Sequence, residues 1–153
     1  MNHHGLAAPR LLPVFEPLES RLLLTTYDLT PADNWLAVVH GRGLRPGDEV
    51  IFHEGTYVSN IRLNFGHRGT AAAPIVIRAA EGEHVTIRRN NTNENVINVE
   101  GGQYLTIKGF ELTGGHRGIA IGQDFFGDNA NARFVTVEDC TIHDVNHIAV
   151  SAN

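Results

Sequence analysis

Apolar and polar residues alternate over short stretches from Val50 onward, and Gly, Asn and Asp interrupt the alternation. Alternation with a period of two is typical of β-strands that bury one face. Four stretches share a phrase: "IVIRA" from 75, "VINVEG" from 96, "GIAIGQ" from 118 and "HIAVSAN" from 147. Their apolar positions predict two columns with steps of 22, 22 and 29: Ile75, Ile97, Ile119 and Ile148, then Ile77, Val99, Ile121 and Val150.

A second phrase lies between the copies of the first: "VTIRR" from 85, "LTIKG" from 105 and "VTVED" from 135. Around it, "YLTIKGFELTGG" from 104 and "FVTVEDCTIHDV" from 134 align without a gap, so that Thr106 meets Thr136 and Leu112 meets Ile142. Both series lengthen at one place. We therefore expect the segment 123–133 to be an insertion, after which Phe134 resumes the column of Leu105.

A period near 20–22 residues predicts an all-β solenoid, in which stacked turns bury a core that no single repeat could bury. Alternation within the strands directs Ile87 and Ile107 inward, and directs Arg88 and Lys108 outward. Matching outward positions on neighbouring turns also predict an ion pair between Arg78 and Glu100.

The sequence before the strands divides into a tail and a helix. Residues 1–30 carry three of the six prolines and no clear period, so we expect a tail there. Residues 32–40 predict one short amphipathic helix with Asp33 as its N-cap. Trp35 and its neighbours on that helix could cover the open end of the first turn, and residues 31–153 would form the β-domain.

The formal net charge of −5 gives no support to a general nucleic-acid-binding role. No apolar run approaches the roughly 20 residues of a membrane-spanning helix. Cys140 is the only cysteine, so no intramolecular disulfide can form.

Several stretches together resemble a known family. "LRPGDEVIFHEGTY" (44–57), "GTAAAPIVIRAAEGEHVTI" (69–87) and "YLTIKGFELTGG" are similar to the N-terminal portion of right-handed parallel β-helix proteins, in particular the polysaccharide lyases that include alginate lyases and chondroitinase B. The resemblance implies a right-handed parallel β-helix of about three to four turns, behind a short capping helix. It also implies an acidic polysaccharide as partner, with Ca²⁺ as the associated ion.

The segment 15–25, "FEPLESRLLLT", resembles the LEPR-XLL segment near the N-terminus of many large bacterial surface proteins, although Ser20 replaces its proline. The resemblance implies export, and therefore an extracellular or cell-surface location.

Three residues are candidates for catalysis. In the resembling lyases a Lys and an Arg on the outer face remove a proton beside a carboxylate and neutralise the enolate, which suggests Lys108 and Arg88 here. We expect Lys108 to stand in a ladder with Arg88 and Glu138. His143 could act as acid or base, or bind a metal with Asp144 and His147, which aligns with Gly118 of the preceding turn.

The predicted insertion supplies the remaining candidates. Asp124 and Asp128, with Glu138 and Asp139 nearby, could offer oxygen ligands to Ca²⁺. Phe125 and Phe126 could stack on sugar rings, or fold back onto the coil.

Two functions fit the sequence. The chain could be the opening part of a secreted or surface protein that acts on or binds acidic polysaccharide, without being catalytic by itself. It could instead be a non-catalytic structural or adhesive module of a bacterial surface protein. The strand pattern stops after "HIAVSAN", so we expect an incomplete helix whose C-terminal end continues into further turns or self-associates.

Overall fold

The computed structural model describes residues 5, 7–12, 24–122 and 131–152. The described chain is mostly β, with one helix of five residues, α1 (Trp35–Val39). Within the described residues, no helix has the length and apolar character needed to cross a bilayer.

Three parallel sheets form the domain, and we number them by their first appearance. The first sheet has the order β1-β2-β4-β7-β10, the second β11-β8-β5-β3, and the third β12-β9-β6. The strands of the first sheet are β1 (Thr26–Leu29), β2 (Glu49–Phe52), β4 (Ile75–Ala79), β7 (Gln103–Lys108) and β10 (Arg133–Glu138). Those of the second are β3 (Gly55–Ser59), β5 (Val85–Arg89), β8 (Glu111–Gly114) and β11 (Thr141–His143), and those of the third are β6 (Ile97–Glu100), β9 (Arg117–Gly122) and β12 (Ile148–Ala152).

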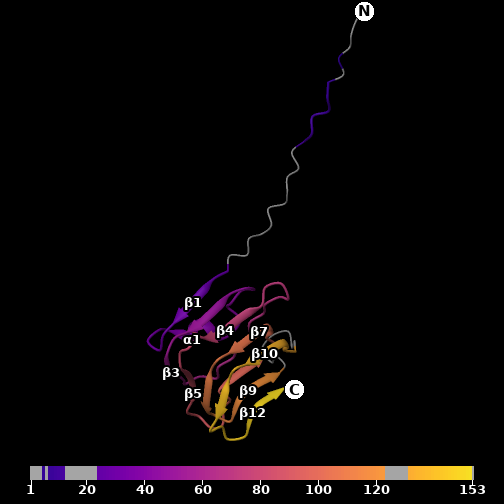
Figure 1. The fold of residues 1–153 in the computed structure, drawn as a ribbon. Coiled ribbons are helices and arrows are strands. Elements are labelled where there is room, and N and C mark those ends of the chain that lie inside the picture. Colours follow the sequence, from indigo (N-terminus) through magenta and orange to yellow (C-terminus); the bar gives the residue numbers. More distant parts are fainter. Residues whose placement is uncertain (1–4, 6, 13–23, 123–130, 153) are drawn as a thin grey trace, which may run out of the picture.

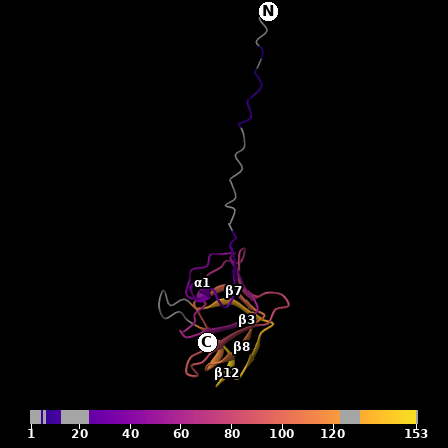
Figure 2. The same ribbon diagram turned by 90° about the vertical axis from the view of Figure 1, so that its left-hand side faces the viewer.

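The chain visits the sheets in a repeating order, one strand of each sheet in turn: β4, β5, β6, then β7, β8, β9, then β10, β11, β12. In Figure 1, β1, β4, β7 and β10 follow one another down the molecule, and β12 lies at the lower end of both views (Figures 1 and 2). This is a β-helix-like arrangement. Its right-handed winding and the capping role of α1 remain predictions.

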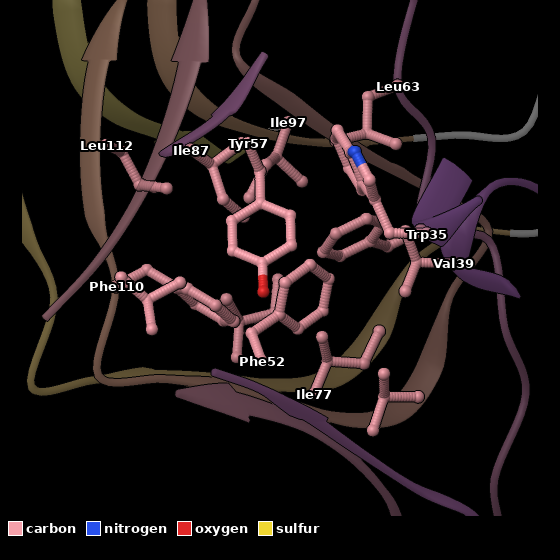
Figure 3. Close-up of a cluster of buried hydrophobic side chains, with 14 of the residues drawn as sticks. Trp35, Val39, Phe52, Tyr57, Leu63, Ile77, Ile87, Ile97, Phe110 and Leu112 are labelled. Atoms are coloured by element: carbon pink, nitrogen blue, oxygen red, sulfur yellow. The ribbon is translucent and has the colours of Figure 1, made fainter. Parts of the chain in front are cut away.

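The core lies between the three sheets and consists of their inward side chains. Ile77, Ile87, Ile107 and Leu112 have no exposed surface, as the alternation predicts. At the α1 end, four aromatic rings meet edge to face in the cluster of Figure 3: Phe52 lies 4.8 Å from Tyr57, 5.3 Å from Phe110 and 6.0 Å from Trp35, between ring centroids. Such contacts add about 0.5–1.5 kcal/mol each to the burial of the rings.

The column assignment from the sequence is wrong in part. Ile75 pairs with Leu105 in the first sheet, whereas Ile97 pairs with Ile119 in the third. Similar apolar phrases serve different sheets, because each turn contains three strands that all bury one face. The true spacing between partners is therefore 30 positions for Ile75 and Leu105, rather than 22.

The ungapped alignment of 104–115 with 134–145 is confirmed. Thr106 pairs with Thr136 and Leu112 with Ile142. Val135, not Phe134, lies beside Leu105, while Phe134 is 65% exposed and stacks on Tyr104 at 4.5 Å. Ten residues separate β9 from β10 where two separate β6 from β7, and most of the predicted insertion, 123–130, lies outside the described residues.

Two local predictions at the N-terminal side also need correction. The N-cap of α1 is Asn34, and the Asp33 carboxylate instead accepts hydrogen bonds from the backbone N–H and hydroxyl of Thr30, at 2.7 and 2.8 Å. The predicted tail over 1–30 includes β1, which pairs with β2.

The ion pair predicted between Arg78 and Glu100 is absent from the described structure. Arg78 Nε donates to Glu49 Oε1 at 2.6 Å, and Glu100 instead pairs with Arg62. The reason is that these residues belong to different sheets. The outer face of β6 is covered by the segment around Asn64, which bridges to Asn98 and brings Arg62 to Glu100.

Candidate functional site

The outer face of the second sheet brings two of the predicted catalytic residues together. Strand register places Arg88 beside Thr113 and Thr113 beside His143, so the three side chains form one outward row. Two strand spacings separate Arg88 from His143, about 10 Å. The neighbouring outward row contains Thr86 and Glu111.

His143 lies between two carboxylates on this face. Its Nε2 is 2.6 Å from Glu111 Oε1 and its Nδ1 is 2.8 Å from Asp144 Oδ2. These bonds, Glu111 first and Asp144 second, raise the pKa of His143. The imidazolium form is thus favoured, and both ring nitrogens already have hydrogen-bond partners. His143 is therefore better suited to carry a positive charge than to act as a general base.

Glu111 is the centre of this polar group. Besides His143, it lies 2.5 Å from His84 Nε2 and accepts a hydrogen bond from the Thr86 hydroxyl at 2.8 Å. The bond from His143, followed by that from Thr86 and the charges of the two histidines, lowers the pKa of Glu111. A carboxylate held in this way remains ionised and orients the His143 ring.

His147 does not belong to the group. Its backbone N–H donates to His116 O at 2.8 Å, and the His116 and His147 rings lie 5.2 Å apart. His147 therefore aligns with His116 rather than with Gly118 of the preceding turn, and the expected set of His143, Asp144 and His147 does not form.

Lys108 lies on a different face, the outside of the first sheet. Its register neighbours are Arg78 and Glu138, so the predicted ladder is right for Glu138 and wrong for Arg88. The Lys108 Nζ lies 3.3 Å from Glu138 Oε1 and 3.4 Å from Asp139 Oδ2. Hydrogen bonding and charge from Glu138, then from Asp139, raise the pKa of Lys108, whereas a lysine base needs a lowered one.

A hollow of about 750 Å³ opens beside Lys108. Its charged lining is mostly acidic, with Glu81, Glu83, Glu138 and Asp139 around Lys108 and Arg78. Since Arg78 is paired with Glu49, this hollow offers little free positive charge to an anionic sugar.

The residues suggested for Ca²⁺ are only partly described. Asp124 and Asp128 lie outside the described residues, as do the sugar-stacking candidates Phe125 and Phe126. Glu138 and Asp139 both face the Lys108 ammonium, and the described ranges contain no group of three His, Cys, Asp or Glu that could hold a metal ion. Ca²⁺ takes six to eight oxygen ligands, so the described pair alone does not fit it.

Three further residues matter to the second sheet and were not predicted from the sequence: Glu111, His84 and Arg89. Arg89 is 4% exposed and follows the outward Arg88. Strict alternation from the inward Ile87 would have placed Arg89 inward. No comparable signal was available for His84 and Glu111, because their contact depends on which strands are neighbours.

The fold is shared with solved polysaccharide lyases. An alginate lyase from Paenibacillus sp. str. FPU-7 matches with a TM-score of 0.67 and 24% identity, over 82% of this chain and 39% of that chain. A mannuronic acid specific polysaccharide family 6 lyase from human gut microbiota matches with a TM-score of 0.60 and 23% identity, over 76% of this chain and 26% of that chain.

A family model described as Chondroitinase B matches residues 39–151, and the chain therefore belongs to this family. The predicted resemblance to polysaccharide lyases is confirmed. The chain spans about two fifths and about a quarter of the lengths of the two lyase structures. A search of curated proteins gave no match.

Proposed function

We propose that this chain is the β-helix-like portion of an extracellular or cell-surface protein that binds an acidic polysaccharide, and that the chain alone does not cleave it. The observation that carries the proposal is the Chondroitinase B family match over residues 39–151. The two solved polysaccharide lyases share its fold.

The outer face of the second sheet is the better place for such a polymer. Arg88 is exposed, and no ion pair to it exists within the described part of the chain. His143 adds a positive charge when protonated, and its pKa is raised. Uronate and sulfate groups repeat along acidic polysaccharides, so a row of cations spaced across strands can meet more than one of them.

The absence of cleavage is proposed because neither described candidate base is free. The pKa of Lys108 is raised by its carboxylates, and both nitrogens of His143 are engaged. These two observations also favour the alternative, a non-catalytic structural or adhesive module of a bacterial surface protein.

The test is a calorimetric titration of the full chain with polymannuronate, polyguluronate and dermatan sulfate, with dextran as the neutral control. We expect saturable binding of at least one acidic polymer, weakened by added salt because ionic contacts are screened. Repeating the titration with Ca²⁺ or with a chelator tests the proposed ion.

Each outcome has a distinct meaning. Equal lack of binding to acidic and neutral polymers would reject the proposal in favour of the structural module. Appearance of the ultraviolet absorbance of an unsaturated uronate would show cleavage, and would return Lys108 and Arg88 to the candidate catalytic residues. Surface labelling of intact producing cells tests the proposed location.

A further inference from the structure

Two aromatic rings stack where β7 and β10 begin, on the outer side of the first sheet. Tyr104 and Phe134 hold equivalent positions in successive turns, because their neighbours Leu105 and Val135 pair in the strand register. The two ring centroids are 4.5 Å apart and the ring planes differ by 15°. The rings are therefore stacked face to face, whereas the rings of the core meet edge to face. We call Tyr104 and Phe134 the aromatic pair.

Phe134 has one ring face that is still free. The residue is 65% exposed, although Tyr104 covers one face of its ring. The exposed area must therefore belong to the opposite face and to the rim of the ring. Among the large apolar side chains that are exposed in the described part of the chain, Phe134 is the only aromatic one. Leaving such a ring in water is unfavourable, so its exposure calls for an explanation.

The backbone at both positions lies in the left-handed region, which bulky side chains rarely adopt. Tyr104 has a φ of +47° and Phe134 a φ of +54°. The other described residues with positive φ are glycines, which have no side chain to clash, and two aspartates, Asp139 and Asp144. Glycine or asparagine would relieve the strain, yet both turns carry an aromatic ring instead. Backbone strain of this kind is concentrated at ligand-binding sites, which makes the exposed ring a candidate for contact with a ligand.

The surface beside the free face is polar. Thr106 and Thr136 lie one outward position further along the two strands and pair with each other, and Thr136 is exposed. Arg133, which precedes Phe134, is exposed as well. A single aromatic side chain offers at most about 250 Å² of surface, whereas a stable protein interface needs about 800 Å² on each partner. One apolar ring among polar neighbours is therefore too small for a protein partner, and its size matches a single sugar ring.

A pyranose ring has an apolar side that fits such a surface. When its hydroxyls are equatorial, as in β-linked glucose, the axial C–H bonds of alternate ring carbons point to one face, and the polar groups lie around the rim. The face of an aromatic ring carries partial negative charge, so it attracts these C–H bonds while both surfaces leave water. The Thr136 hydroxyl can meet the hydroxyls at the rim of the sugar. The contact requires no charge on the ligand.

We infer that the aromatic pair binds one pyranose ring of a saccharide, with the C–H face of the sugar on the free face of Phe134. Tyr104 supports Phe134 from the other side and fixes its orientation before the sugar binds. The contact lies on the first sheet, whereas Arg88 and His143 lie on the second. It is therefore independent of the proposed function, which relies on positive charge.

The experiment follows the aromatic ring resonances of the full chain by nuclear magnetic resonance while cellotetraose, a β-linked glucose oligomer, is added. We expect the Phe134 and Tyr104 ring signals to shift and saturate, and added salt to leave the shift unchanged because no ionic contact is involved. Isomaltotetraose, which has the linkage of dextran, is the matched control, since its axial anomeric oxygens lie on the face that would stack. No saturable shift with cellotetraose, or an equal shift with isomaltotetraose, would overturn the inference.

Three variants locate the effect at Phe134. Phe134→Asn removes the ring and suits the left-handed backbone, so it should weaken cellotetraose binding about tenfold while the melting temperature is kept or raised. Phe134→Tyr keeps the ring and should keep the affinity. If Phe134→Asn does not fold, Phe134→Leu takes its place, because leucine keeps apolar bulk without a flat face and should weaken binding as well. Unchanged affinity without the ring would show that the aromatic pair only supports the stacked turns, and would reject the sugar site.

A dilution series of the protein alone tests whether a second copy of the chain covers the ring instead. We expect the Phe134 ring signals to be independent of protein concentration. Signals that move with protein concentration and not with cellotetraose would overturn the inference.

Arg88→Gln separates this inference from the proposed function. The substitution should weaken the binding of an acidic polymer and leave cellotetraose binding unchanged, because Arg88 lies on the second sheet. If cellotetraose binds and no acidic polymer does, the inference is supported and the proposed function fails. If an acidic polymer binds and cellotetraose does not, the proposed function is supported and the inference fails.

Discussion

The outer faces of the first and second sheets both carry cations, but only one of them has positive charge left for a ligand. On the first sheet Arg78 is paired with Glu49, and Lys108 with Glu138 and Asp139. On the second, no carboxylate of the described chain pairs with Arg88, and Arg89 meets only neutral oxygens. Neighbouring carboxylates, rather than the number of arginines and lysines, decide which face can attract an anion.

Strand register explains the difference. Lys108 has Glu138 directly opposite on the next strand, whereas Arg88 has Val58 on one side and Thr113 on the other. Side chains opposite each other across a strand pair interact most strongly, so one acidic residue in the next turn is enough to neutralise a lysine.

Lys108 points outward while its neighbour Ile107 points inward, and two substitutions test this strand phase most severely. Ile107 is fully buried, and Ile107→Ala should lower the free energy of unfolding by about 2–5 kcal/mol. Lys108→Ala should change it by no more than about 0.5 kcal/mol, as for an exposed residue. Denaturant unfolding measures both. Similar losses would show that the strand phase is wrong.

Lowering the pH could add positive charge to the second sheet only while the protein stays folded. His67 limits the pH range in which it does so. Burial lowers the pKa of His67 to about 4, while its ring bonds to Val39 O at 2.7 Å and to Leu44 N. The unfolded chain takes up this proton near the ordinary pKa of about 6.5, so stability is lost as pH falls from there toward 4, by up to about 3 kcal/mol.

His67→Phe removes this proton uptake. The difference in unfolding free energy between wild type and variant should therefore shrink between pH 7 and pH 4, as judged by denaturant titration with standard buffers. A constant difference over this interval would mean that His67 does not resist protonation in the folded chain.

Glu111→Gln tests the charge on the second sheet directly. Glu111 is the first cause of the raised pKa of His143, so the substitution should lower that pKa toward its ordinary value. Because the folded pKa of His143 is raised, the ion pair stabilises the fold at low pH and the effect is lost as pH rises through that pKa. Titration of the His143 ring resonances measures the change, with His67 as the internal control. An unchanged pKa would identify Asp144 as the controlling partner.

The smallest expected effect is on polysaccharide binding by Lys108→Gln. The charge of Lys108 is already opposed by Glu138 and Asp139, so its loss should change the affinity for an acidic polymer by no more than about twofold. The calorimetric titration described above measures it, beside Arg88→Gln. If Lys108→Gln lost more affinity for the polymer than Arg88→Gln, the first sheet rather than the second would be the face that attracts the anion.

Much of the fold could be predicted from the sequence, because a strand that buries one face alternates apolar and polar residues. Alternation gave the inward Ile87 and Ile107, and the repeated phrase at 104–115 and 134–145 gave a true register. The sheet to which each strand belongs was not accessible. "IVIRA" and "VINVEG" satisfy the same inward pattern in different sheets, so similarity alone aligned strands that do not pair.

Because the sequence does not show which strands are neighbours, it could not predict how the candidate site is assembled. The sequence named Arg88 and His143 but could not place them on one face, since they are joined only through Thr113 of the strand between them. It placed Lys108 beside Arg88 because both follow a similar phrase. Arg89 could have been predicted to face inward by alternation, but the lack of a partner for its Nε depends on backbone carbonyls that no sequence pattern marks.

The positions of the only tryptophan and the only cysteine give the molecule two optical reporters in different turns. Trp35 is enclosed by Phe52 and Tyr57 near the start of the stack, so its emission should shift to the red when the first turns open. Cys140 lies in the last described turn, and burial raises the pKa of its thiol, which keeps the thiol slow to react with a dye until that turn opens. Fluorescence and thiol labelling, followed in one denaturant series, would therefore distinguish a stack that melts as a single unit from one that frays turn by turn.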